Sequence, residues 1–185
     1  MTGALWELDE EGWIKEGRHV PSPNFDVRPA GETPQLVVIH AISLPPDQFG
    51  GAGVEQLFTN TLNPDEHSYY AQIQHLRVSA HFFIRRDGEL IQFVGGASRA
   101  WHAGVSSWRG RERCNDFSIG VELEGCDSKP FEPVQYIRLS KLIKSLRERY
   151  PLSDICGHSD IAPGRKTDPG PFFDWRRLHA LLAEE

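Results

Sequence analysis

The apolar residues of this chain fall into short runs that predict alternating strands and helices. Residues 36–40 (LVVIH) form a β-branched apolar run that ends in a polar residue, which predicts a buried strand. Residues 54–62 (VEQLFTNTL) predict a short helix. Two apolar stretches within residues 78–94 flank Asp87-Gly88, a dipeptide that strongly favours a hairpin turn. The first half of the chain is therefore expected to contribute strands joined by loops and a short helix.

The second half of the chain repeats the mixture of strands and helices. Residues 118–125 (SIGVELEG) alternate, so we expect the apolar side chains on one face of a strand and Gly120, Glu122 and Glu124 on the other. A short apolar piece surrounds Ile155. Residues 174–185 predict a capped helix. Residues 133–150 predict an amphipathic helix that begins at a proline, with apolar positions mostly three or four apart at Val134, Ile137, Leu139, Leu142, Ile143 and Leu146.

This order of elements predicts a mixed α/β (α+β) fold around one central, largely mixed β-sheet. No repeat, low-complexity tract or long linker divides the 185 residues, so we expect a single domain over 1–185. Residues 1–35 are expected to form an extended lead-in that belongs to this domain, because their later part is rich in proline and polar residues.

Composition narrows the classes of function. A formal net charge of -6 and a pI near 5.8 argue against a general nucleic-acid binder, which needs a basic face. The acidic first residues do not resemble a signal peptide, and no run is apolar enough for a membrane span. Cys114, Cys126 and Cys156 form an odd set without CxxC spacing, which is typical of a reducing compartment. We therefore expect a cytoplasmic protein.

Two histidines and one aspartate form a candidate metal site. His40 ends the predicted buried strand, His158 follows the apolar piece around Ile155, and Asp168 lies ten residues further on in a turn bounded by proline and glycine. Two histidines and a carboxylate are a common catalytic zinc set that leaves a fourth position open. The spacing alone equally allows Asp168 to belong to a plain turn. Four other histidines lie in polar or helical surroundings and are interpreted as surface residues: His19, His67, His75 and His179.

Further residues near these segments could complete a hydrolytic site. A carboxylate beside a zinc-bound water can accept its proton, and the strand glutamates Glu122 and Glu124 are both candidates for this base. They could equally face solvent. Lys166 lies two residues before Asp168 and could stabilise a developing oxyanion.

The segment 98–118 combines tryptophan, histidine and arginine side chains. The aromatic residues of this segment are Trp101, His102 and Trp108, and three arginines follow them: Arg109, Arg111 and Arg113. Aromatic faces suit sugar rings and guanidinium groups suit carboxylates, so this segment could bind a ligand with both features. The alternative is a solvated basic loop anchored by buried tryptophans.

Four stretches together resemble a known family: VVIHAISLPPDQFGG, HLRVSAHFFIRRDGE, RAWHAGVSSWRGRERCNDFSIGVELEG and GHSDIAPGRKTDPGPFFDW. They are similar to the cytosolic N-acetylmuramoyl-L-alanine amidases of bacteria, in particular to the type that acts on 1,6-anhydro-N-acetylmuramyl peptides. The likeness runs from about Gly12 to Trp175. It implies a fold shared with peptidoglycan recognition proteins, in which helices pack on a central mixed sheet beside a zinc groove.

The resemblance also implies a role for particular residues. The zinc ligands would be His40, His158 and Asp168. Glu122, rather than Glu124, would be the catalytic glutamate, and Lys166 would stabilise the transition state. Substrate contacts would come from Arg77, Arg113, Trp101 and His102.

The sequence departs from the pattern of this family at three positions. Ala41 follows the first zinc histidine, where the family usually has asparagine. Ser159 and Gly164 stand where close members often have cysteine and glutamate. An asparagine at position 41 could hydrogen-bond the amide of the substrate, so Ala41 bears on affinity or on the preferred ligand. None of the three positions is a predicted metal ligand, so the zinc assignment is unaffected.

The resulting hypothesis is a zinc-dependent amidase that cleaves the bond between the (1,6-anhydro-)N-acetylmuramic acid lactyl group and L-alanine in recycled cell-wall fragments. Its partner would be this small muropeptide, with no nucleic acid or membrane, and the protein is expected to be a monomer. One alternative is a non-catalytic module of the same fold that only binds peptidoglycan fragments. Another is a zinc hydrolase that acts on a different amide.

Overall fold

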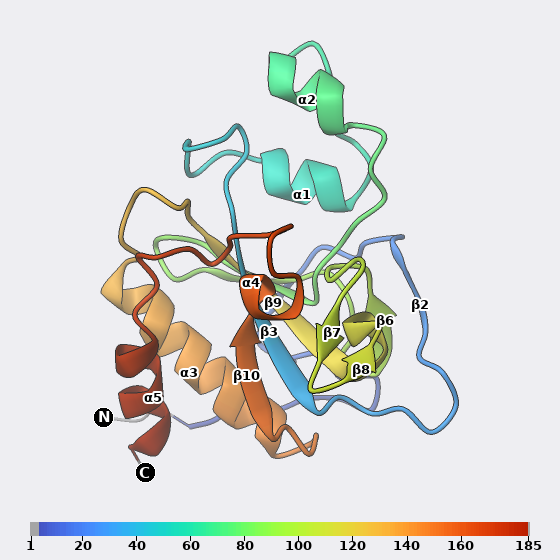
Figure 1. Cartoon of the computed structure of the whole chain (residues 1–185), viewed down its shortest axis with the longest axis vertical. Coiled ribbons are helices and arrows are strands. Elements are labelled where there is room, and N and C mark those ends of the chain that lie inside the picture. Colours follow the sequence, from blue (N-terminus) through green and yellow to red (C-terminus); the bar gives the residue numbers. More distant parts are fainter. Residues whose placement is uncertain (1–3, 185) are drawn as a thin grey trace.

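A six-stranded mixed sheet forms the centre of the molecule (Figure 1). The computed structural model describes residues 4–184. Strand β5 is antiparallel to β4, whereas β4, β9, β3 and β10 run parallel to one another. The predicted mixed α/β class is therefore confirmed. In spatial order the strands are β1 (Arg18–His19), β5 (Leu90–Gln92), β4 (Phe82–Ile84), β9 (Ser118–Glu124), β3 (Leu36–Ile42) and β10 (Asp154–Gly157).

Two helices, α3 (Pro133–Arg147) and α5 (Trp175–Ala183), lie side by side against one face of this sheet (Figure 1). The apolar residues of β9 share one buried cluster with Leu139, Leu142, Ile143 and Leu146 of α3, so the predicted apolar stripe packs as expected. Ile137 is an exception, because its side chain is 53% exposed and Tyr136 takes the core position instead. The spacing of apolar residues in the sequence did not show which of these two neighbouring residues faces the core.

The helices α1 (Gly53–Phe58) and α2 (Ser68–Ile73) form a separate group beyond one end of the central strands (Figure 1). The predicted short helix corresponds to α1. Helix α2 was not predicted, since only Tyr70 of its six residues is buried and so short a helix shows no apolar period. Its N-terminus is capped by His67, whose Nδ1 accepts the Tyr69 backbone N–H.

Most other predicted elements are present. Strands β4 and β5 pair antiparallel around a turn in which the Arg85 N–H donates to the Glu89 carbonyl, as the Asp87-Gly88 signal indicated. Asp174 caps α5 by accepting the Arg177 N–H. The lead-in contains β2 (Phe25–Val27), which pairs with β6 (Ser98–Ala100). The remaining elements are β7 (Ser107–Trp108), β8 (Arg111–Glu112), the 3₁₀ helix η1 (Cys114–Phe117) and α4 (His158–Ile161).

The topology brings distant residues to one edge of the sheet. Strands β9, β3 and β10 are parallel neighbours, so their carboxyl ends lie together, where ligand-binding groups commonly gather in such sheets. His40 is the register partner of Glu122 across β3 and β9. Gly157 pairs with Ile39, which places His158, the next residue, level with His40.

No helix between residues 4 and 184 is both long and apolar enough to cross a membrane.

Candidate active site

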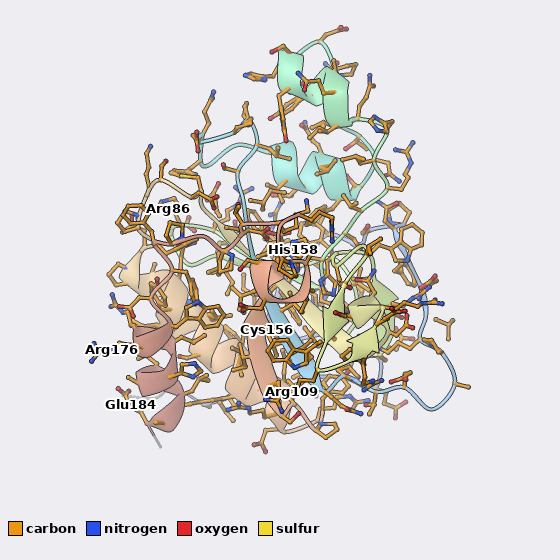
Figure 2. The ribbon with its side chains drawn as sticks, in the orientation of Figure 1. Arg86, Arg109, Cys156, His158, Arg176 and Glu184 are labelled. Atoms are coloured by element: carbon orange, nitrogen blue, oxygen red, sulfur yellow. The ribbon has the colours of Figure 1, made fainter. Side chains whose placement is uncertain are left out.

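His40, His158 and Asp168 converge at the carboxyl ends of β3 and β10. The two Nδ1 atoms of His40 and His158 lie 3.0 Å apart. Oδ2 of Asp168 is 3.2 Å from the His40 Nδ1, and its Oδ1 is 3.1 Å from the His158 Nδ1. In Figure 2, His158 lies just beyond Cys156, where β10 ends and α4 begins. The structure thus unites three residues that span almost 130 positions of sequence.

The geometry and chemistry of these atoms fit a metal ion. Nε2 of His158 lies 3.2 Å from the Ala103 carbonyl, which can only accept, so this nitrogen carries the ring proton and Nδ1 offers a lone pair. Two ligand atoms on a tetrahedral zinc, each at about 2.0–2.1 Å, lie about 3.3 Å apart. The separations found here are close to that value. Lone pairs that face each other at such distances repel unless a cation lies between them.

The protonation states of the buried ligands also favour a cation. Burial lowers the pKa of His40, so its ring is neutral at neutral pH. Burial alone would raise the pKa of Asp168, but its close contacts with His158 and His40 outweigh burial and hold this pKa below its usual range. Neutral imidazoles and an ionised carboxylate are the forms that bind zinc.

Glu122 places a second carboxylate beside this cluster. Its Oε1 lies 4.0 Å from the His40 Nδ1, and its buried Oε2 has no hydrogen-bond partner among the described residues. Burial first, and the nearby Asp168 carboxylate second, raise the pKa of Glu122 well above its usual value. A carboxyl group with a raised pKa is a stronger base than an ordinary carboxylate, which suits a general base and acid.

Glu124 lies on the same face of β9 but is occupied by other contacts. Its carboxylate accepts the backbone N–H groups of Gly50, at 2.6 Å, and Arg86, at 3.0 Å. The Arg85 guanidinium lies 3.6 Å from it. These bonds join two loops to the end of the strand. Of the two glutamates that alternation left open, only Glu122 adjoins the histidine–aspartate cluster.

A groove of about 510 Å³ runs over the cluster, and Lys166 and Trp101 line it. Lys166 and Asp168 border the same groove, and Asp168 lies in a turn that the Gly170 N–H closes by donating to the Thr167 carbonyl. One wall is apolar and comes from α1, α2 and the loops around them. Its residues are Leu44, Pro46, Leu57, Phe58, Tyr69, Ile73, Leu76 and Val78.

His102 borders the groove, but both of its ring nitrogens have partners in the protein. Nδ1 lies 2.8 Å from the His40 Nε2, and Nε2 lies 3.1 Å from the Ser118 hydroxyl. Burial lowers the pKa of His102 well below its usual value, so the ring is neutral. The ring of His102 therefore contacts the candidate metal-binding residue His40 and Ser118, and neither nitrogen is directed into the groove.

The structure does not bring Arg77 and Arg113 to the cluster. The exposed Arg77 donates from Nη1 to the carbonyls of Gln74 and Leu76. Arg113 has a left-handed backbone with φ of 60°, and its Nε lies 3.3 Å from Asp116. It lines a different depression, shared with Arg165. Their contact with substrate remains a prediction from the resemblance.

His81 supports the site and was missed by the sequence reasoning. It is fully buried, and its Nδ1 accepts the Gly120 N–H at 3.0 Å. Burial lowers the pKa of His81 to about 3. A histidine directly before the apolar run Phe82–Ile84 was a usable signal, because a polar residue beside a buried strand needs a partner.

A groove at the ends of parallel strands, with two histidines, one aspartate and a buried glutamate, defines the class of the protein as a hydrolase with a candidate metal centre. The profile of a family described as N-acetylmuramoyl-L-alanine amidase matches residues 30–171. The chain belongs to the N-acetylmuramoyl-L-alanine amidase family, and it is an enzyme rather than the non-catalytic binding module considered above.

Individual relatives extend this likeness over almost the whole chain. The 1,6-anhydro-N-acetylmuramyl-L-alanine amidase AmpD of Enterobacter cloacae is 57% identical over 177 residues, which cover 95% of both chains. A crystal structure of a selenomethionine AmpD derivative superimposes with a TM-score of 0.92 at 56% identity, covering 95% of this chain and 98% of that one. The Escherichia coli amidase AmiD, in complex with anhydro-N-acetylmuramic acid-L-Ala-D-γ-Glu-L-Lys, gives a TM-score of 0.56 at 31% identity, covering 94% and 65% of the two chains.

Proposed function

We propose that this enzyme uses zinc to hydrolyse the amide bond between the lactyl group of 1,6-anhydro-N-acetylmuramic acid and L-alanine of the stem peptide. The observation that supports this proposal most strongly is the convergence of His40, His158 and Asp168 beside the buried carboxylate of Glu122. The names of the relatives at more than half identity supply the substrate. Their agreement over 95% of both chains supports the same reaction here.

His40, His158 and Asp168 would hold the zinc ion through two Nδ1 atoms and a carboxylate. When bound, zinc acidifies a water molecule and polarises the amide carbonyl. Three protein ligands would leave a fourth position open, as in other catalytic zinc sites. The side chains then have to orient the amide and move protons.

Glu122 would move the protons. Its carboxylate accepts a proton from the attacking water and later donates it to the nitrogen of L-alanine, so that the amine leaves uncharged. The raised pKa of Glu122 suits both steps, because a stronger base accepts the proton readily and still returns it. Its position next to the His40 strand keeps the carboxylate within reach of the reacting atoms.

Lys166 and Trp101 would act on the substrate. The Lys166 ammonium borders the groove near Asp168, where a cation stabilises the negative charge that develops on the carbonyl oxygen. Trp101 offers an aromatic face to the sugar ring. Arg77 and Arg113 would bind stem-peptide carboxylates, which requires their side chains to turn from the contacts described above.

The proposal includes the setting of the reaction. Residues 1–185 would act as one domain and as a monomer in the cytoplasm. The three cysteines are free thiols, which suits a reducing compartment. The muropeptide would be the only partner that the reaction needs.

Product analysis tests the proposal. Purified enzyme is incubated with anhydromuropeptide or with ordinary muropeptide, each with zinc or with a chelator, and the products are identified by mass spectrometry. We expect free stem peptide from the anhydromuropeptide with zinc and none with the chelator. Zinc-independent cleavage would contradict the cofactor, and cleavage of neither substrate would contradict the reaction.

A further inference from the structure

We propose that His102 is a positioning residue that fixes the orientation and tautomer of the metal ligand His40, rather than a contact for the substrate. This inference rests on the proposed metal site. It starts from the 2.8 Å separation between the His40 Nε2 and the His102 Nδ1. The two rings meet edge to face, with an interplanar angle of 90°.

The direction of this hydrogen bond follows from the donor set. A metal ion at the His40 Nδ1 requires a lone pair there, so the ring proton of His40 lies on Nε2 and is donated to His102. His102 accepts it on Nδ1 and therefore carries its own proton on Nε2, which donates to the Ser118 hydroxyl 3.1 Å away. Both nitrogens of His102 are then used, and neither can bind a ligand in the groove.

The backbone around His102 holds its ring in place. The N–H groups of His102 and Ala103 both donate to the Asn115 Oδ1, at 3.1 and 2.8 Å. The adjacent Trp101 exchanges hydrogen bonds with Ser79. A ring on so constrained a segment can direct its partner with little loss of conformational freedom.

Gly120 provides the space for this ring. A Cβ atom at position 120 would lie 2.5 Å from Cγ of His102, closer than side-chain atoms approach. Gly120 therefore serves the metal site by lacking a side chain. It lies on the face of β9 that also carries Glu122, two residues further on.

Two variants test the proposal, because their amide groups take the positions of different ring nitrogens of His102. The amide oxygen of His102→Asn falls near the position of Nδ1 and can still accept from His40, whereas the amide of His102→Gln reaches the position of Nε2 and cannot. We expect His102→Asn to keep the zinc affinity within about threefold and His102→Gln to weaken it by roughly 10–100-fold, the usual effect of losing such a partner. Zinc affinity is measured by competition with a chromogenic chelator, and KM and kcat are measured at saturating zinc.

The outcomes separate the alternatives. Equal zinc affinity in both variants, with a KM raised at least tenfold, would show that His102 contacts substrate and would overturn the inference. A wild-type protein that binds no zinc would instead refute the proposed function. Should both variants fail to fold, Ser118→Ala provides the test: removing the acceptor of His102 Nε2 should weaken zinc binding several-fold, and an unchanged affinity would overturn the proposal.

Discussion

His40 and Glu122 are register partners on the parallel strands β3 and β9, and the His40 Nδ1 lies 4.0 Å from the Glu122 Oε1. Adjacent positions in a sheet project from the same face, so a proposed metal ligand and a proposed proton acceptor are held at a distance set by backbone hydrogen bonds. The separation depends little on loops. Two strands thus provide the rigid half of the site.

Replacing Glu122 by glutamine should separate catalysis from metal binding. We expect Glu122→Gln to keep zinc and to lower kcat by about 10²–10⁴-fold, because the amide cannot accept the proton of the attacking water. Glu124→Gln is the matched control, since this residue lies on the same face of β9 but bonds to loop backbone. It should lose stability rather than kcat. Metal analysis and steady-state kinetics measure both variants, and a Glu122→Gln enzyme with near-normal turnover would refute this assignment.

Zinc should stabilise the folded protein markedly. The converging lone pairs of His40, His158 and Asp168 repel one another without a cation, and the unfolded chain lacks this arrangement. At zinc concentrations near 100 times Kd, ligand linkage contributes about 2.7 kcal/mol, or roughly 5–10 °C in Tm for a domain of this size. Differential scanning calorimetry with zinc and with chelator measures the shift. Asp168→Asn should abolish most of it, and an equal shift in this variant would place the metal elsewhere.

Lys166→Met should lower kcat without removing zinc. The ammonium borders the groove but is not among the three converging ligands. Losing one group that stabilises an oxyanion commonly costs about 10²–10³-fold in kcat. The adjacent Arg165 is a suitable control, because Arg165→Met removes a cation that binds the carbonyls of Ala103 and Val105. Equal losses of kcat in the two variants would indicate a general effect of charge.

His81 should make stability fall as the solution becomes acidic. Burial lowers the pKa of His81 from 6.5 to about 3 in the folded protein, so between these values the unfolded chain binds a proton that the folded chain does not. Stability is therefore complete above about pH 6.5 and decreases as the pH falls toward 3, by at most about 1.4 kcal/mol per pH unit.

The His81→Asn variant tests this dependence. Urea unfolding from pH 7 to 4.5 should give a shallower slope for the variant than for the wild type, although the variant is less stable at pH 7. Carboxylates titrate in both proteins and cancel in the comparison. Parallel curves would show that His81 becomes protonated without unfolding.

Short-range patterns account for the elements that were predicted correctly. The run at 36–40, the Asp87-Gly88 turn and the alternation at 118–125 each depend on neighbouring residues. Patterns of this kind do not identify which distant residues a side chain contacts in the folded protein. Ile137 shows the limit, because its spacing suits the apolar stripe while its side chain is half exposed.

Resemblance contributed what local patterns could not. Alternation placed Glu122 and Glu124 together, and only the likeness to the amidases selected Glu122. Contacts with other segments explain that choice physically, since two loops use the Glu124 carboxylate. The same likeness placed His102 at the substrate, whereas its ring nitrogens point to His40 and Ser118.

The sequence by itself determined the mixed succession of strands and helices, the reactive residue types and the family they resemble. Local propensity and side-chain chemistry are properties of short segments, so they can be recognised without coordinates. Only the tertiary structure decided that His40, Glu122 and His158 lie together, that Glu124 does not join them, and that the ring of His102 contacts His40. These relations depend on the pairing of strands far apart in the chain, and strand register sets which side chains share a face.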